Sequence, residues 1–283
     1  MPNAILLISC PDNKGITATV TQFVYQNFGN ILHADQHTDD QFNTFFMRVE
    51  WSMDGFALNE EKVAGAFKPI ADKFKMDWKI YFSDKVPKVA VFVSKYLHCL
   101  YDLLYRYRAG YLKCEIPLII SNHSDAANVA ENFGIKFHEM PMTKENKAAQ
   151  EARQLKLLRE ADVELIVLAR YHQILTPQFI ATYPEQIINI HHSFLPAFAG
   201  KDPYAQAYQK GVKLIGATSH FVTEVLDEGP IIAQDTVGVS HRDTLADLKR
   251  RGEDLEKIVL SDAVRFYLER KILVYNNKTV VFD

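Results

Sequence analysis

The segment NIHHSFLPAFAG, residues 189–200, places an amide and two imidazoles directly after the apolar run QII. If that run is a strand, alternate residues share a face, so Asn189 and His191 point to one side and His192 to the other. An amide and an imidazole on one face can donate hydrogen bonds to an oxyanion formed during acyl transfer, and the imidazole can also move protons. The alternative is that these groups only cap a strand end, and this stretch alone supports both interpretations equally.

A second segment, TSHFVTEVLDEGPIIAQ at residues 218–234, contains a further histidine and an acid. His220 is expected to end one strand, and Asp227 lies in a turn before Gly229. An aspartate beside Gly-Pro is common for purely structural reasons. The two segments together nevertheless favour convergence of these polar groups on one crevice. His191 and His192 point to opposite faces and no Cys or Glu beside them completes a set of ligands, so no metal is expected.

The first 83 residues are predicted to form a separate domain with its own strands and helices. Apolar periodicity predicts a strand at residues 4–10, a helix from residue 16 that Gly29 stops, and two strands that meet at a turn of Asp39 and Asp40. A helix at residues 59–74 and a strand at 76–82 follow. The order βαββαβ is that of ferredoxin-like domains. The polar segment SDKVPK is a linker, which predicts domains at residues 1–83 and 84–283.

The second domain is predicted to be α/β, with a Rossmann-like, mostly parallel sheet. Short apolar runs at residues 89–94, 116–121, 163–169 and 186–190 are typical of buried parallel strands. Two more strands are expected at residues 212–222 and 230–239, then a long helix at 243–270 and a hairpin at Asn276 and Asn277. In such sheets the ligand crevice lies beyond the carboxyl ends of the strands, which is where Asn189 and His191 stand.

Composition narrows the functional classes. The 283 residues carry 35 acids and 32 bases, for a formal charge of -3, and the bases form no run, so a nucleic-acid partner is not expected. The N-terminal apolar run is too short for a signal peptide or a membrane span, which predicts a cytoplasmic protein without a membrane partner. Cys10, Cys99 and Cys114 form no CxxC pair and are expected to be buried free thiols.

NIHHSFLPAFAG together with HFVTEVLDEGP resembles the signature of the folate-dependent formyltransferase family over most of residues 88–283. The resemblance implies a catalytic triad of Asn189, His191 and Asp227, with His220 supporting the aspartate. His192 stands where the transformylase motif has proline. LARYHQIL is similar to the folate-lining segment, although His172 replaces an expected apolar residue, usually Met. The implied folate-binding residues are Arg170, Tyr171, Gln173, Ile174, Leu175, Glu228 and Gly229.

The resemblance implies attack on the formyl group of 10-formyltetrahydrofolate, with no metal and no permanently bound cofactor. The branch of the family with an added front domain and His192 hydrolyses this substrate, which serves tetrahydrofolate recycling and formate supply for purine synthesis. The alternative is formyl transfer to an amine. A glycinamide ribonucleotide transformylase would carry a Gly-Ser-Asn loop after its first strand. This chain has no glycine there until Gly110, so hydrolysis is favoured. Transfer to tRNA is disfavoured, because no basic C-terminal domain follows.

The front domain resembles an ACT domain, whose loops bind small effectors and whose copies pair with each other. PDNKGI and NFGNI are the matching loops, which implies effector-binding residues Asp12, Gly15, Gly29 and Asn30. An amino-acid effector and a homo-oligomer are therefore expected. A non-enzymatic amino-acid sensor is the third hypothesis, and the intact triad argues against it. His33 and His37 suggest a metal only weakly, since polar positions on a strand explain them better.

Overall fold

The computed structural model describes residues 2–197 and 202–283. The last residues of the 189–200 motif therefore lie outside the described residues. The chain divides into two compact units. The first comprises residues 1–86, 269–275 and 280–283, and the second comprises residues 87–268 and 276–279. The sequence placed the border at residue 83 and assigned the whole C-terminus to the second domain, whereas residues 269–275 and 280–283 belong to the first unit.

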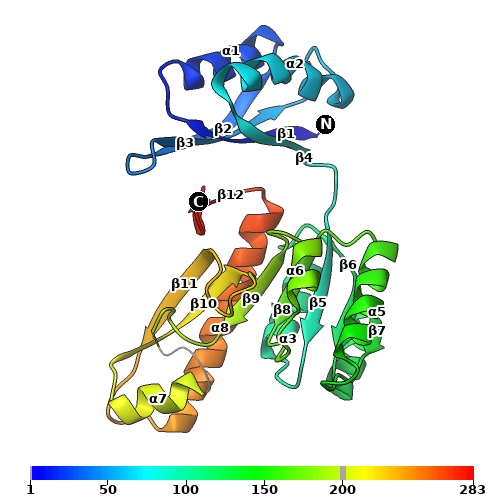
Figure 1. Ribbon diagram of the computed structural model, residues 1–283, viewed down its shortest axis with the longest axis vertical. Helices are drawn as coiled ribbons and strands as arrows, with labels where there is room; N and C mark the ends of the chain where they lie inside the picture. The colour runs from blue at the N-terminus through cyan, green and yellow to red at the C-terminus, as the bar shows by residue number, and fades with distance from the viewer. Residues whose placement is uncertain (1, 198–201) are drawn as a thin grey trace. The chain divides into compact units, whose positions relative to one another are not determined.

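The first unit contains a four-stranded antiparallel sheet with two helices on one face (Figure 1). Its elements are β1 (Asn3–Pro11), α1 (Ile16–Gln26), β2 (Asn30–Asp39), β3 (Thr44–Ser52), α2 (Glu60–Phe74) and β4 (Asp77–Phe82), and the strand order is β2-β3-β1-β4. Alternate residues of β1 and β3, such as Leu6 and Met47, pack against the apolar stripes of α1 and α2. This element order is typical of ferredoxin-like domains.

The C-terminal hairpin joins β12 (Ile272–Tyr275) to β13 (Lys278–Val281). Asn276 and Asn277 both have a positive φ, 45° and 59°, which is the backbone of a two-residue type I′ turn and confirms the predicted hairpin. Phe282 is buried against Leu7 and Phe46 of the first unit. A pattern read along the chain does not show apolar burial of this kind, which groups the last residues with the first unit.

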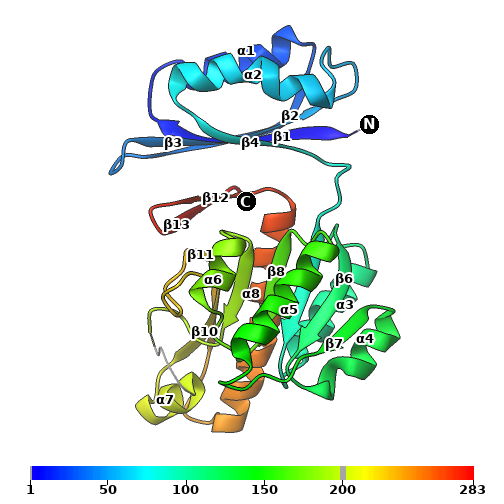
Figure 2. The same cartoon turned by 45° about the vertical axis from the view of Figure 1, so that its right-hand side comes forward.

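The second unit is a seven-stranded, mostly parallel sheet with helices on both faces (Figure 2). The strand order is β11-β10-β9-β8-β5-β6-β7. The strands are β5 (Lys88–Val93), β6 (Glu115–Ser121), β7 (Lys136–Glu139), β8 (Leu165–Ala169), β9 (Ile187–His191), β10 (Leu214–Phe221) and β11 (Ile231–Gly238). β10 pairs antiparallel with both β9 and β11, and the other strand pairs of this sheet are parallel. The α/β prediction is confirmed, although β7 was not predicted because its four residues are largely polar.

The helices of the second unit carry the crossovers of this sheet. They are α3 (His98–Arg108), α4 (Ala127–Phe133), α5 (Lys147–Glu160), α6 (Pro177–Thr182), α7 (Pro203–Lys210) and α8 (Leu245–Leu268), with a short 3₁₀ turn at Ser124–Ala126. α5 and α6 cover one face of the sheet, and α3 and α8 the other (Figure 2). After β5, the next two strands in the sequence, β6 and β7, lie on one side of it, and the following strands, β8 and β9, lie on the other side. The strand order therefore reverses beside β5, which is the topological switch point of the sheet.

The structure bears on three smaller expectations. The three cysteines are free and buried, as expected. His33 and His37 lie on β2, where four residues span about 13 Å, too far to share one metal ion. Among the described residues no helix has the length and apolarity needed to cross a bilayer.

Candidate active site

Asn189, His191 and His220 are brought together by the pairing of β9 with β10. The two strands are antiparallel, and their register sets Asn189 opposite His220. The Nδ2 atom of Asn189 lies 3.2 Å from Nε2 of His220. Alternation along β9 predicted that Asn189 and His191 share a face, but only the register of β10 brings His220 to them.

Asp227 reaches the two histidines from the loop between β10 and β11. Its Oδ1 atom lies 3.2 Å from Nδ1 of His191 and 3.8 Å from Nε2 of His220. Asp227 has a positive φ of 57°, which aspartate tolerates better than most residues. A Cβ at Gly229 would overlap the carbonyl oxygen of Phe221, so only glycine allows the loop to return this closely to β10. The sequence Asp-Glu-Gly therefore fixes the loop that delivers the carboxylate.

The hydrogen bonds of this cluster define its protonation pattern. His220 donates from Nδ1 to the carbonyl of Phe221 at 2.8 Å, so the Nε2 atom of the neutral ring accepts from the amide of Asn189. Burial alone would raise the pKa of Asp227, but the hydrogen bond and the charge of His191 outweigh it and hold that pKa below its usual range. Asp227 is therefore an ionised carboxylate behind His191.

His191 presents an unused polar atom. Its side chain is only 6% exposed, and its Nε2 atom is buried with no hydrogen-bond partner among the described residues. Asn189 uses one amide hydrogen on His220, which leaves the second to donate elsewhere. Buried donors without partners are costly and rare, so a ligand is expected to accept hydrogen bonds from these two atoms. Two donors backed by a carboxylate suit the stabilisation of an oxyanion.

The predicted folate-lining segment follows β8 and is only partly available to a ligand. Tyr171 and Leu175 are each 5% exposed and lie in the hydrophobic core, so their side chains do not face solvent. Ile174 is 62% exposed and Gln173 is partly exposed, so these two can contact a ligand. The guanidinium of Arg170 lies largely buried, with Nε 3.5 Å from Oε2 of Glu256.

The loop that carries Asp227 also offers apolar side chains. Glu228 is exposed and Gly229 is buried. Val225 and Leu226, which were not singled out from the sequence, are 56% and 60% exposed. Their position as apolar residues directly before Asp227 is the signal that could have identified them as candidates for contact with a ligand ring.

The connection from β5 to α3 contains side-chain contacts where a phosphate-binding enzyme would have glycines. The hydroxyl of Ser94 donates to Asn122 at 2.6 Å and accepts the backbone N–H of His172 at 3.0 Å. The ring of Tyr96 lies 5.5 Å from that of His172 and 5.3 Å from the guanidinium carbon of Arg170. The unexpected His172 therefore makes an edge-to-face contact with Tyr96, in a segment without a glycine.

The predicted effector residues of the first unit lie in two separate groups. Asp12 and Gly15 precede α1, whereas Gly29 and Asn30 follow it, and its eleven residues span about 16 Å. Within a single copy of the chain, the two pairs of predicted effector residues therefore do not form one site. The expectation that Gly29 stops the helix is wrong, because the left-handed residue is Phe28 and α1 already ends at Gln26. Gly29 is instead required because a Cβ there would press into Val24 and Phe56.

Comparisons with known proteins agree with this geometry. The Formyl transferase family profile matches residues 87–264. A formyltetrahydrofolate deformylase of Synechocystis sp. is 56% identical in sequence to this chain, and the aligned region covers 99% of this chain and 98% of that protein. The crystal structure of a formyltetrahydrofolate deformylase from Pseudomonas syringae has a TM-score of 0.98 at 45% identity, over 100% of this chain and 95% of that one. The crystal structure of glycinamide ribonucleotide transformylase 1 from Symbiobacterium toebii has a TM-score of 0.67 at 30% identity, over 72% of this chain and 97% of that one.

Proposed function

The chain belongs to the formyltetrahydrofolate deformylase family, which hydrolyses 10-formyltetrahydrofolate to formate and tetrahydrofolate, and from this membership we propose that Asn189, His191 and Asp227 are its catalytic residues. The observation that supports this assignment best is the buried Nε2 atom of His191, which has no partner among the described residues while its Nδ1 atom meets Asp227. A donor held ready in this way suits an oxyanion that exists only during the reaction.

The reaction begins when water attacks the formyl carbon and creates a tetrahedral oxyanion. The free amide hydrogen of Asn189 and the Nε2–H of a protonated His191 donate to that oxygen, and each such donor contributes about 3 kcal/mol in comparable sites. Asp227 stabilises the imidazolium through Nδ1 of His191. His220 orients the Asn189 amide by accepting its other hydrogen.

Two proton transfers complete the hydrolysis. The attacking water gives a proton to Asp227, and N10 of the folate receives one from His191 as the bond between N10 and the formyl carbon breaks. Once His191 has lost its charge, one of the influences that lower the pKa of Asp227 is removed while the hydrogen bond from Nδ1 of His191 remains, and the carboxylate becomes a better acceptor. Asp227 then releases its proton to solvent water and Nε2 of His191 takes one up, which restores the starting state. We assign folate contact to the exposed side chains of Ile174, Val225 and Leu226 and to the partly exposed Gln173.

The experiment that tests this function is incubation of the purified protein with 10-formyltetrahydrofolate alone. Formate and tetrahydrofolate should appear in equal amounts without any amine. Glycinamide ribonucleotide should neither accelerate turnover nor be formylated, because no glycine loop follows β5 to hold its phosphate. Formylglycinamide ribonucleotide as the main product in mass spectrometry would contradict the hydrolytic function.

We infer further that the first unit is an ACT domain that binds a free amino acid and that the enzyme is a homo-oligomer. The two groups of predicted effector residues lie at opposite ends of α1, so a site that uses both needs two copies of the unit. Regulated hydrolysis would balance tetrahydrofolate recycling against formate supply for purine synthesis.

An effector should change formate release in a screen of the free amino acids. Asp12 is exposed in the loop before α1, so Asp12→Ala should abolish the response, whereas the control Asp54→Ala in another exposed loop should keep it. Sedimentation of the protein as a monomer, together with an unchanged rate across all amino acids, would contradict both parts of the inference.

A further inference from the structure

His192 is a third imidazole at the site that the proposed mechanism does not use. It follows directly after β9, and its ring centroid lies 5.2 Å from that of His191 and 5.8 Å from that of Tyr204. His192 is partly exposed, and its ring nitrogens make no hydrogen bond to the residues that the structure describes. The side chain next to the catalytic histidine is therefore free to bind a small polar molecule.

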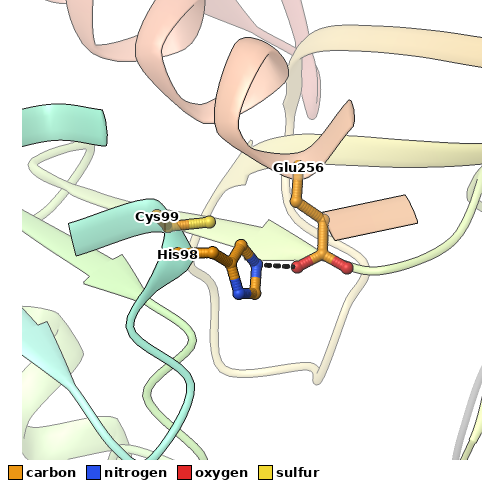
Figure 3. A group of neighbouring side chains, drawn as sticks. All are labelled: His98, Cys99 and Glu256. Atoms are coloured by element: carbon orange, nitrogen blue, oxygen red, sulfur yellow. Dashed lines mark hydrogen bonds and ion pairs between the residues drawn. The ribbon is translucent and has the colours of Figure 1, made fainter. Parts of the chain in front are cut away.

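A buried polar network fixes the tyrosine on which His192 packs. Tyr204 of α7 donates its hydroxyl to Oε1 of Glu256 at 2.6 Å. The Oε2 atom of Glu256 accepts from Nε2 of His98 at 2.8 Å, as Figure 3 shows, and lies 3.5 Å from Nε of Arg170. A Cβ at Gly252 would overlap the Tyr204 hydroxyl, so α8 needs glycine there to admit it. The ring of Tyr204 thus has one position, and it limits where His192 can lie.

The same network contains three potential metal-ligating side chains. His98, Cys99 and Glu256 offer donor atoms within 4.8 Å of one another (Figure 3). However, both carboxylate oxygens of Glu256 already accept hydrogen bonds, and the cation of Arg170 stands beside them. Burial also raises the pKa of Cys99 well above its ordinary value, which disfavours the thiolate that a metal requires. These side chains therefore hold Tyr204 in position and do not form a set of metal ligands.

The environment of His192 keeps its ring neutral. Burial, followed by the charge of Arg170, lowers its pKa to about 3. A neutral imidazole has one nitrogen that accepts a hydrogen bond and one that donates. It is a weak base in this state, so it can orient a water molecule without taking the proton from it.

We propose that His192 is a further catalytic residue that binds the attacking water through its free ring nitrogen, and that Tyr204 and Glu256 are positioning residues that hold it. This inference rests on the proposed function, in which water attacks the formyl carbon. His192 accepts a hydrogen bond from that water while the water oxygen forms its bond to the carbon. The proton of the water still goes to Asp227, and N10 still receives one from His191, so His192 has no net change.

The test compares kcat and KM of purified full-length variants in formate release. His192→Ala should lower kcat by about tenfold to a hundredfold, with KM for 10-formyltetrahydrofolate within about threefold of the wild type. His192→Asn should recover part of the loss, because its amide oxygen can still accept from water. Tyr204→Phe should lower kcat by about threefold to tenfold at constant KM, because it only frees the ring that positions His192. The exposed His241 supplies a control, and His241→Ala should behave as the wild type.

The outcomes separate this inference from the proposed function. A wild-type enzyme that releases no formate would refute the function itself. If the wild type is active but His192→Ala keeps more than a third of its kcat, His192 does not bind the water. Equal losses in His192→Ala and His192→Asn, with a parallel rise in KM, would assign it a structural role only. Should His192→Ala fail to fold, His192→Asn and Tyr204→Phe decide the matter: the inference fails if both keep the wild-type kcat.

Discussion

Asp227→Asn and His191→Ala should each lower the turnover of 10-formyltetrahydrofolate at least about a hundredfold. Asparagine keeps the shape of Asp227 but removes the charge that stabilises a protonated His191 across 3.2 Å, so the oxyanion loses its charged donor. Alanine at position 191 removes both the donor and the proton for N10. Steady-state formate release gives kcat, and the loss should fall on kcat more than on KM, because these interactions are strongest in the transition state.

Neither Asp227→Asn nor His191→Ala should unfold the protein. Thermal unfolding monitored by circular dichroism would establish this. Asn189→Ala should show a similar fall in kcat, since it removes the second donor to the oxyanion. His241→Ala serves again as the control, because His241 is exposed. If His191→Ala retained more than a tenth of the wild-type kcat, His191 would have no catalytic role.

Glu256→Ala should reduce the free energy of unfolding by about 3–5 kcal/mol, because it breaks a buried ion pair from one side. Glu256 is fully buried, and its removal leaves the guanidinium of Arg170 without a counter-charge and the Tyr204 hydroxyl and the His98 imidazole without an acceptor. Urea unfolding at pH 7 would measure the change. Asp254→Ala on the same helix breaks only an exposed pair with Lys257, so it should cost less than about 1 kcal/mol.

The deficit of Glu256→Ala should depend on pH. Burial alone would raise the pKa of Glu256, but the hydrogen bond from His98 and the charge of Arg170 lower it below its ordinary value. A lowered pKa means that the carboxylate contributes its full stability above the ordinary value near 4.5, and loses it as the pH falls through the lowered one. The difference between wild type and Glu256→Ala should therefore be full at pH 7 and shrink in acid. An unfolding free energy equal to that of Asp254→Ala would contradict the buried ion pair.

The sequence by itself determined the elements and the types of the reacting groups. Apolar runs and helical spacing identified β5, β6, β8, β9 and the long helix α8, because burial on a sheet or a helix face leaves a periodic record. Alternation in β9 placed Asn189 and His191 on one face. The motif resemblance then named His220 and Asp227 as their partners.

Only the tertiary structure decided which groups meet across elements. The register of β10 against β9 set His220 opposite Asn189, and no local pattern encodes the register of two strands that are far apart in the sequence. The network of Glu256 with His98, Arg170 and Tyr204 joins α8, α3, the end of β8 and α7. In the sequence Glu256 is one acid among many on an amphipathic helix. It stabilises the site because its buried carboxylate accepts hydrogen bonds from Tyr204 and His98 and pairs with Arg170, and only the fold brings these groups together.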